Sequence, residues 1–448
     1  MNYLDIHIGI DDEDREIGGC TTHFATLLIV KFLGRFKSLK FIDYPNLVRL
    51  NPAIPWKTRG NGAVSIHIKV PENILDKVID EIIAMHEEYS EAFRLGHGKE
   101  PGIVIVKGDI PSELTWLYRK AVSDVVALSI ARKIAHDINA EVLVDGRGIV
   151  GALAAIGWFA LEDDCTYELL LYRSRDMWGY ERRVDSRSIR SIETNYQDIF
   201  SSYDYEEKRV IVTPRGPDPV LLGLRGENPE TLLRAMNDLI IHEPISFWCI
   251  FRTNQGTNAH SYPRRISNLR PYQTCIVRGV VHSNPRIERG GHVVFHIRQE
   301  SEVLRVITYK PSGLTSIARK LVPGDIVSVL GAIKMWSDGV LTLNAEELIL
   351  ERAVELYRAI APRCPRCGGS MESLGKGKGF RCRKCKYRDP DAKKQLVRVR
   401  RDIDAGIYLG PPSSHKHLLK PYRRFGKENI CRIKEPTGQW IGPLRISQ

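Results

Sequence analysis

At 448 residues, the chain is too long for one hydrophobic core and should divide into about three or four domains. Apolar residues make up 43% and charged residues 27%, as in an ordinary globular protein. No apolar run reaches the roughly 18–20 residues of a membrane span, and the acidic start MNYLDIHIGIDDEDRE is unlike a signal peptide. The sequence disfavours membrane and secreted proteins, and we expect a cytoplasmic one.

The net charge of +12 is unevenly distributed. Residues 362–448 contain 22 Lys and Arg against 7 Asp and Glu, whereas the first 361 residues contain 44 against 47. A solubilising tail would explain this pattern, but so would a C-terminal fifth that binds a polyanion.

The first 108 residues alternate strands and helices. Apolar residues alternate in YLDIHIGI (3–10), AVSIHIKV (63–70) and GIVIVKG (102–108), and they recur at helical spacing over 21–36 and 72–89. With the extended stretch FIDYPNLVRL, the order becomes βαββαβ, which is the ferredoxin-like pattern. A helix over 112–136 then leads to EVLVDGRGIVGALAAIGWFAL.

A second α/β module follows from Thr166 to about Phe251. Its predicted strands are TYELLLYR, RVIVT, VLLGLRG and ISFWCIF. Asn228 and Pro229 are typical of a helix start, which predicts a helix over Pro229–Leu239.

Residues 270–352 change to short strands separated by turns. The predicted strands are TCIVRGVVHS, HVVFHIRQ, VLRVITYK, DIVSVLGAIKM and VLTLNAEELIL, with a short helix SIARKL after the third. This pattern is typical of an OB barrel. Barrel residues that could bind nucleic acid are Arg278, His282, His292, Phe295, His296 and Arg298.

Nine cysteines occur in the chain, and four have the spacing of a metal site. Two CxxC pairs bring Cys364, Cys367, Cys382 and Cys385 together, with fourteen residues between the pairs. Four thiolates suit a structural Zn²⁺ and leave no open coordination position. The other five (Cys20, Cys165, Cys249, Cys275 and Cys431) are scattered, so we expect reduced thiols rather than a disulfide framework.

The stretch GIDDEDREIGGCTTHFA (9–25) places Asp11, Asp12 and Asp14 directly after an apolar strand. Carboxylates there could hold Mg²⁺ beside a nucleotide. The stretch then passes through Gly18 and Gly19 to a predicted helix start at Thr21, whose free N–H groups could bind phosphate. A solvated acidic turn and a threonine N-cap are equally compatible with this stretch alone.

The stretch RLNPAIPWKTRGNGAV (49–64) combines rigid prolines with Lys57, Arg59 and glycines. Such a loop would complement phosphate, so the two stretches together indicate an ATP-type site without a Walker-A or protein-kinase motif. A surface hairpin turn is the alternative.

Two further stretches are less specific. DGRGIVGALAAIGW (145–158) is compatible with a tightly packed helix of small residues, and FRTNQGTNAHSY (251–262) with a polar interdomain loop. Asp164, Glu168 and Arg173 lie near the strand after the glycine-rich helix, where charged residues are ordinary.

Taken together, these motifs and PPSSHKHLLKP (411–421) resemble one family: the archaeal tRNA(Ile) 2-agmatinylcytidine synthetases, or agmatidine synthetases. The resemblance extends in order over nearly the whole chain. It departs at Glu13, where the family often has threonine. It implies a multidomain α+β fold with an α/β kinase-like domain (1–140), a ferredoxin-like domain (141–265), an OB-fold β-barrel (266–355) and a C-terminal zinc ribbon with a basic tail (356–448).

The resemblance also implies a reaction. ATP would phosphorylate the C2 oxygen of the wobble cytidine in an isoleucine tRNA with a CAU anticodon. The primary amine of agmatine would then displace that phosphate, releasing AMP and phosphate. The modified tRNA would read AUA as isoleucine.

The family's functional residues carry over motif by motif. Catalytic roles are implied for Asp11, Asp12, Asp14, Thr21, Lys57 and Arg59, with Asp11 and Asp12 as Mg²⁺ ligands and Thr21 as the threonine that becomes phosphorylated. ATP would contact Gly18, Gly19, Cys20, Thr22, Gly60, Asn61 and Gly62. The agmatine and cytidine pocket would contain Gly146, Arg147, Gly148, Gly151, Asp164, Asn254 and His260, with Asp145 or Asp164 as the carboxylate for the guanidinium. Barrel, ribbon and tail would grip the tRNA.

Two other functions compete with this enzyme. One is a non-catalytic OB and zinc-ribbon protein that binds RNA or single-stranded DNA. The other is a different nucleotidyl or phosphoryl transferase acting on nucleic-acid ends. A polyanion binder gains nothing from three clustered carboxylates, which favours an enzyme.

Overall fold

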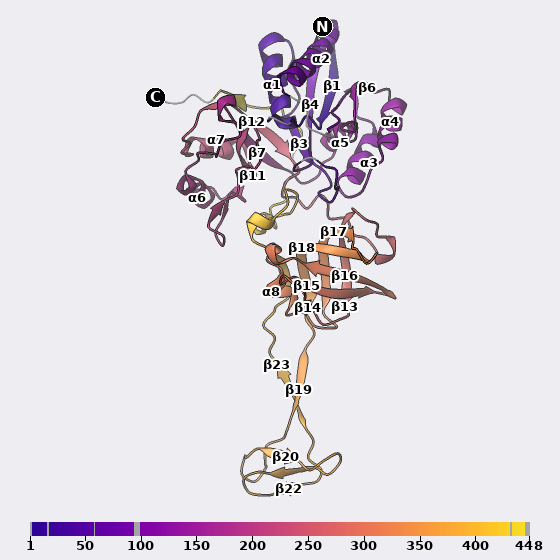
Figure 1. Ribbon diagram of the computed structural model, residues 1–448, viewed down its shortest axis with the longest axis vertical. Helices are drawn as coiled ribbons and strands as arrows, with labels where there is room; N and C mark the ends of the chain where they lie inside the picture. The colour runs from indigo at the N-terminus through magenta and orange to yellow at the C-terminus, as the bar shows by residue number, and fades with distance from the viewer. Residues whose placement is uncertain (1, 16–17, 58, 94–98, 431, 444–448) are drawn as a thin grey trace.

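The computed structural model describes residues 2–15, 18–57, 59–93, 99–430 and 432–443. A large sheet with its helices lies at one end, a barrel lies in the middle, and a small zinc-ribbon domain lies at the far end (Figure 1). Within the described residues, no helix is long and apolar enough to cross a membrane.

The first half of the large sheet has the predicted ferredoxin-like order. Its four strands run in the order β5-β1-β4-β3, and every neighbouring pair is antiparallel. The short strand β2 (Lys40–Phe41) pairs with β4, and β6 (Glu141–Asp145) adds an edge beside β5. The elements of this unit are β1 (Tyr3–Asp11), α1 (Thr21–Arg35), β3 (Asn46–Arg49), β4 (Gly62–Pro71), α2 (Leu75–Ala92) and β5 (Gly102–Lys107).

Helices cover both faces of this half-sheet. Helix α1 packs against β1 and β4, and α5 (Ile149–Phe159) packs against the same strands and β5. A Cβ on Gly9 of β1 would overlap the main chain of Ala152, so glycine there permits the close approach of α5. The predicted helix over 112–136 is two helices, α3 (Ser112–Ala121) and α4 (Leu128–Asp137), which are separated by a turn.

The second half of the sheet repeats the same order as β12-β7-β11-β8. Three predicted strands and the predicted helix are confirmed, but RVIVT forms only the two-residue strand β10 (Arg209–Val210), paired with β9 (Tyr203–Asp204). Helix α6 was not predicted because its buried apolar side chains are only Ile189 and Ile192. The elements are β7 (Thr166–Arg173), α6 (Ser186–Asn195), β8 (Ile199–Phe200), β11 (Val220–Gly226), α7 (Pro229–Asn237) and β12 (Ile245–Thr253).

The two halves join through one parallel strand pair, β3 and β12. Arg252 on β12 lies opposite Asn46 on β3. Its buried guanidinium places Nε 2.7 Å from Asp43 Oδ2 and lies over the ring of Trp158, 4.7 Å from the ring centroid. One buried cation therefore binds both halves and helix α5.

The predicted OB barrel is confirmed. Five strands close through the order β13-β17-β18-β16-β15 and an additional β13–β15 pairing, and α8 (Thr315–Ala318) is shorter than predicted. The strands are β13 (Thr274–Val281), β15 (Val293–Gln299), β16 (Glu302–Thr308), β17 (Ile326–Met335) and β18 (Leu341–Arg352), with β14 (Arg286–Ile287) pairing outside the ring.

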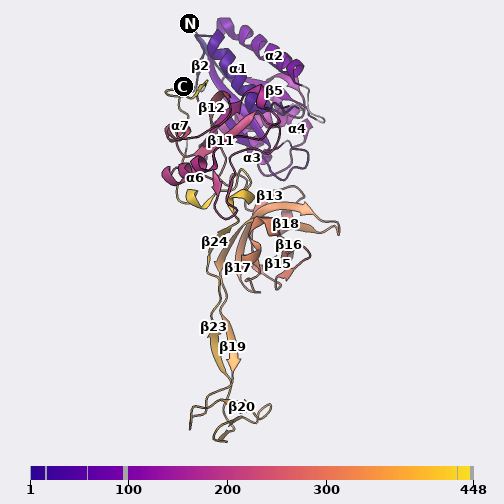
Figure 2. The same cartoon turned by 60° about the vertical axis from the view of Figure 1, so that its left-hand side comes forward.

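Two exposed antiparallel strands, β19 (Leu356–Ile360) and β23 (Gln395–Val399), connect the barrel to the zinc ribbon (Figure 2). The ribbon itself contains β20 (Met371–Ser373), β21 (Phe380–Cys382) and β22 (Arg388–Asp389). The chain then returns: β24 (Gly406–Leu409) pairs with β18, and β25 (Ile441–Gly442) pairs with β12.

We expect Gly157→Ala to lower the free energy of unfolding by about 1–3 kcal/mol. An added Cβ would overlap the carbonyl oxygen of Leu114 where α5 meets α3. Gly34→Ala is the control, since a Cβ there meets nothing within 4 Å; it should stabilise α1 by about 0.5–1 kcal/mol. Denaturant unfolding followed by near-UV circular dichroism measures both, and equal midpoints for the two variants would contradict this packing.

Candidate active site

Two adjoining cavities lie where the acidic stretch after β1 meets the basic glycine loop. Both contain residues of each stretch, so the structure brings the two predicted clusters together. The first cavity is lined by seven predicted site residues: Asp11, Asp12, Lys57, Asn61, Arg147, Gly148 and Gly151. The second is lined by seven others: Asp14, Cys20, Thr21, Thr22, Arg59, Gly60 and Gly62.

In the first cavity, carboxylates face the beginning of helix α5. Gly148 and Gly151 allow this approach, because a Cβ on Gly151 would overlap Asp11 Oδ2. Asp12 has a left-handed backbone (φ 62°), and its Oδ2 accepts a hydrogen bond from the Glu100 amide at 2.8 Å. This acidic corner lies against the start of α5, where the Gly148, Ile149 and Val150 amides already donate to main-chain carbonyls. Lys57 and Arg147 line the same cavity.

The charges of these carboxylates are poorly compensated. Burial, followed by repulsion from Asp12, raises the pKa of Asp11 well above its usual range, and burial raises the pKa of Asp12 to about 6. Asp12 Oδ1 is buried without a hydrogen-bond partner within the described residues. Because Mg²⁺ is commonly held by one or two carboxylates together with phosphates, Asp11 and Asp12 fit such a site.

In the second cavity, an arginine of the glycine loop lies between two carboxylates. Arg59 Nε is 3.3 Å from Asp14 Oδ1, and its Nη1 forms an ion pair with Asp218. This cavity has a volume of about 320 Å³, several times the ~30 Å³ that one water occupies in the liquid. Arg59, predicted to bind phosphate, therefore binds carboxylates in this structure.

Thr21 is the first residue of α1 and borders the second cavity. Its Oγ1 accepts a hydrogen bond from the Glu13 amide at 3.2 Å. Glu13, the departure from the family pattern, is buried; it pairs with Arg15 and lies 2.7 Å from His86 Nδ1.

Other predicted residues lie outside both cavities. Gly18 and Gly19 have positive φ and lie against Trp178 and Tyr89. A Cβ on Gly146 would overlap the carbonyl oxygen of Pro101. These glycines are required by packing.

The polar residues predicted for the agmatine and cytidine pocket are also bonded elsewhere. Asn254 bonds the main chain of Arg49 and the Tyr118 hydroxyl, and His260 lies 3.5 Å from Glu346. Asp145 pairs with Arg132 at an exposed site.

Asp164, predicted for the agmatine pocket, lines neither of these two cavities. Its carboxylate binds Arg424 Nη2 at 2.9 Å and Lys420 Nζ at 3.3 Å. The tail 411–425, predicted to grip RNA, is instead largely packed between sheet and barrel, and Arg424 is fully buried. Its charges neutralise protein carboxylates, so much of it is unavailable to an external polyanion.

The prediction of reduced thiols is wrong at Cys165, which is disulfide-bonded. The other described cysteines outside the CxxC pairs, Cys20, Cys249 and Cys275, are free and buried. Cys431 lies outside the described residues.

The sequence did not single out four residues that line the second cavity, Arg49, Asp218, Arg225 and His417. Arg49 and Arg225 approach Glu168 at 3.7 and 3.1 Å. Glu168 was noted only as an ordinary strand charge; its burial among apolar neighbours in TYELLLYR was the available signal.

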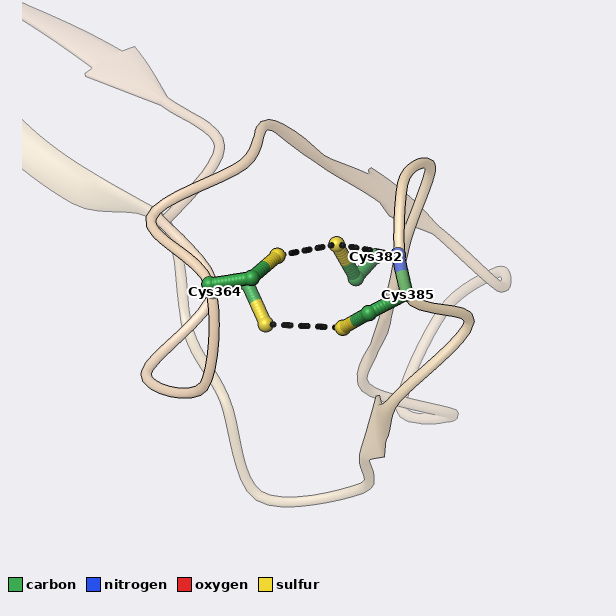
Figure 3. A group of neighbouring side chains, drawn as sticks. Cys364, Cys382 and Cys385 are labelled. Carbon is green, nitrogen blue, oxygen red and sulfur yellow. Dashed lines mark hydrogen bonds between the residues drawn. The ribbon is translucent and has the colours of Figure 1, made fainter.

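The four cysteines of the CxxC pairs form the predicted metal site. Their Sγ atoms all lie within 4.8 Å of one another, and no other such group of three or more metal-binding side chains occurs in the described residues. Figure 3 shows Cys364, Cys382 and Cys385 pointing toward one centre. Hydrogen bonding from the Cys385 amide is the main cause that lowers the pKa of Cys382 to about 6. This donor set suits a tetrahedral structural zinc.

Replacing Cys385 by Ser should remove about one zinc per chain and unfold the ribbon around residues 361–403. The rest should stay folded, because the described structure joins the ribbon to the barrel only through β19 and β23. Zinc analysis measures the metal content, and limited proteolysis shows which part of the chain is unfolded. Cys275→Ala, which removes a free thiol in the barrel, is the control and should keep its zinc. Full zinc in Cys385→Ser would contradict a four-thiolate site.

Family models match four consecutive parts of the chain. The TiaS TCKD domain matches residues 7–145, the TiaS FLD domain 146–260, the OB-fold nucleic acid binding domain 275–351, and the TiaS C-terminal zinc ribbon domain 361–403. These matches follow the order of the architectural units described above.

Full-length relatives show the same similarity. A protein of Ignisphaera aggregans, named as the 2-agmatinylcytidine synthetase TiaS of the second isoleucine tRNA, is 40% identical over 439 residues, covering 95% of this chain and 94% of its own. The structure of a complex of TiaS with that tRNA and ATP has a TM-score of 0.81 at 33% identity and covers 97% of this chain and 99% of its own. A complex of TiaS with the same tRNA, AMPCPP and agmatine has a TM-score of 0.78 at 31% identity and covers 94% of this chain and 97% of its own.

Proposed function

The chain belongs to the family of 2-agmatinylcytidine synthetases that act on the second isoleucine tRNA and catalyses the ATP-dependent conjugation of agmatine to a cytidine of that tRNA, and we propose that the two adjoining cavities are its active site. ATP binds in the first cavity, agmatine binds in the second, and the cytidine enters where they meet. The convergence of the acidic stretch and the basic glycine loop on both cavities carries this proposal.

The chemistry explains why ATP is needed. The C2 oxygen of cytosine is a very poor leaving group, so ATP phosphorylates it, and the agmatine amine then displaces phosphate from C2. The products are AMP, two phosphates and a modified wobble base that pairs with adenine; water releases the second phosphate from the phosphoryl group that Thr21 accepts in this proposal. The cytidine must leave its stack to reach the cavities, as unstacked bases of RNA loops do.

The first cavity matches a triphosphate. Lys57, Arg147 and the N–H groups at the start of α5 supply positive potential. When bound, Mg²⁺ would be held by Asp11 and Asp12 and would neutralise charge on the phosphate oxygens. Thr21 lines the second cavity. In this proposal its hydroxyl accepts a phosphoryl group from ATP.

The second cavity matches agmatine because it already contains a guanidinium. Agmatine is arginine without its carboxyl group, so the Arg59 side chain carries the same guanidinium on a similar carbon chain. Carboxylates bind such planar cations with paired hydrogen bonds. Asp14 and Asp218 therefore form the guanidinium site, and Arg59 withdraws toward the ATP phosphates when agmatine binds.

The barrel and zinc ribbon contribute to tRNA binding. Zinc stabilises the ribbon, which carries part of the positive C-terminal charge away from the active site (Figure 1). Barrel residues such as Arg298 and His282 contact phosphates or bases in this proposal. A purely RNA-binding protein is disfavoured, because it would not need paired carboxylates around a guanidinium site.

Asp12→Asn should reduce agmatine incorporation by at least about 100-fold, because phosphoryl transfer loses a cation ligand. Binding to tRNA should stay nearly unchanged, since the barrel and ribbon supply the tRNA contacts in this proposal. Labelled agmatine, ATP and a CAU isoleucine tRNA transcript give the rate, and filter binding gives the affinity. If the incorporation rate and the affinity for tRNA fall equally in Asp12→Asn, Asp12 has a structural role. If the unmodified protein incorporates no agmatine, the proposed function is refuted.

Asp218→Asn should raise the KM for agmatine by roughly 10–100-fold, because a charge-assisted hydrogen bond is worth about 1.5–3 kcal/mol. The KM for ATP should change little. Asp176→Asn, on an exposed turn of the same domain, is the control and should behave as the unmodified protein. An unchanged agmatine KM in Asp218→Asn would exclude Asp218 from the guanidinium site.

A further inference from the structure

Arg49, the last residue of β3, lines the second cavity. Its main chain is held by Asn254, which follows β12: the Arg49 amide donates to Asn254 Oδ1 at 2.8 Å, and Asn254 Nδ2 donates to the Arg49 carbonyl at 2.9 Å. The pairing of β3 with β4 places Arg49 opposite Gly62. The start of this side chain is therefore fixed by the sheet and by the segment after β12.

The guanidinium of Arg49 has hydrogen-bond donors that no described residue uses. Its Nε is buried without a partner in the described parts of the chain, and the side chain as a whole is only 15% exposed. A carboxylate oxygen, Glu168 Oε2, lies 3.7 Å from Nη2, which is too far for a good hydrogen bond. Buried donors without acceptors are costly, so this guanidinium indicates an acceptor that arrives with a ligand.

The positive charge of Arg49 is also only partly compensated. Glu168 pairs with Arg225, whose Nε is 3.1 Å from Oε1, and it accepts a hydrogen bond from Gln255. Arg49 and Arg225 therefore share one carboxylate. Burial, opposed in part by the charge of Glu168, lowers the pKa of Arg49. A positive potential thus remains at this wall of the cavity, where an anion would be stabilised.

Nη1 of Arg49 faces the glycine loop at the boundary between the two cavities. A Cβ would lie 2.5 Å from Nη1 if it were added to Gly60, and 2.9 Å if it were added to Gly62. Both glycines line the second cavity, whereas Asn61 between them lines the first. The guanidinium therefore lies beside the loop where the cavities meet, which is where the cytidine enters in the proposed function.

The ligand class follows from the chemistry of a guanidinium. Agmatine cannot be the ligand of Arg49, because two guanidinium groups repel each other and both can only donate hydrogen bonds. A phosphoryl group suits it, since its oxygens accept paired hydrogen bonds from the planar fork. The sequence assigned phosphate to Arg59, which binds carboxylates in this structure; the unused donors belong to Arg49 instead.

We propose that Arg49 is a catalytic residue that binds the phosphoryl group on the C2 oxygen of the cytidine, an inference that rests on the proposed function. When the amine nitrogen of agmatine forms its bond to C2, the bond between C2 and the phosphorylated oxygen breaks. The electron pair of that bond leaves with phosphate, and one N–H proton of the amine passes to solvent. Arg49 donates hydrogen bonds to the phosphate oxygens, on which negative charge increases during this step.

The test compares Arg49→Met and Arg49→Lys with the unmodified protein in single-turnover agmatine incorporation. Arg49→Met should be slower by about 100-fold or more, because donors that stabilise the developing charge are lost. Arg49→Lys should have an intermediate rate, since an ammonium keeps the charge but cannot form the paired hydrogen bonds. The KM for agmatine should not rise in either variant, because the carboxylates Asp14 and Asp218 are unchanged.

A second measurement identifies which phosphoryl group Arg49 binds, because Thr21 in the same cavity carries another in the proposed function. Without agmatine, ATP that is labelled in its β and γ phosphates should label both the tRNA and the unmodified protein. Arg49→Met should lose about tenfold or more of the tRNA label and should keep the protein label. If the label at Thr21 falls and the tRNA label stays, Arg49 serves the threonine and the proposal is wrong.

Thermal unfolding of the ligand-free protein separates a catalytic role of Arg49 from a structural one. Because its guanidinium forms no hydrogen bond with the described residues and its charge is poorly compensated, Arg49→Met should unfold at the same temperature as the unmodified protein or at a higher one. A lower midpoint would show that Arg49 stabilises the fold, which would overturn the proposal. Unaltered incorporation in Arg49→Met would also overturn it.

Arg187→Met is the matched control, because it removes an exposed arginine of α6 that lines neither cavity. It should retain incorporation within about threefold, far from the effect of losing donors to a developing negative charge. Failure of the unmodified protein to incorporate agmatine would instead refute the proposed function.

Discussion

The proposed active site depends on one buried cation at the junction of two half-sheets. Arg252 belongs to β12 at the point where this strand pairs with β3. Its guanidinium forms an ion pair with Asp43 and lies over the ring of Trp158. A guanidinium taken out of water needs such partners, because an uncompensated buried charge costs several kcal/mol, roughly 3–5 when one partner is removed. The pair therefore fixes the position of one ferredoxin-like unit against the other. The second cavity lies across this junction, with Thr21 and Arg59 on one side and Asp218 and Arg225 on the other.

Periodicity was sufficient to predict most of the fold. The strands of the first unit and the barrel have strong alternation, and the metal site follows from cysteine spacing alone. Periodicity did not predict the elements whose boundaries depend on tertiary packing. The helix predicted over 112–136 breaks in two, and α6 has too few buried apolar residues to be found. The exact domain boundaries stay a prediction, since α5 follows the first unit in the chain but packs on its sheet.

The candidate site was predicted in part. The acidic stretch and the glycine loop do meet, as local motifs from one domain should. Asp218 and His417 were missed because they lie about 160 and 360 residues after Arg59. The stretch PPSSHKHLLKP, which contains His417, does not by itself indicate that the tail returns to the glycine loop. The ion pair between Asp164 and Arg424 was missed for the same reason, because the two residues are distant in sequence.

The route of the chain has a consequence for biosynthesis. Along the chain, the two half-sheets come first, the barrel second and the zinc ribbon third (Figure 2). The segment that contains His417 and Arg424 follows the ribbon. A nascent chain on the ribosome can thus form most of both half-sheets and the five-stranded barrel while the second cavity still lacks His417. Chemistry on tRNA begins only after nearly all of the message has been translated.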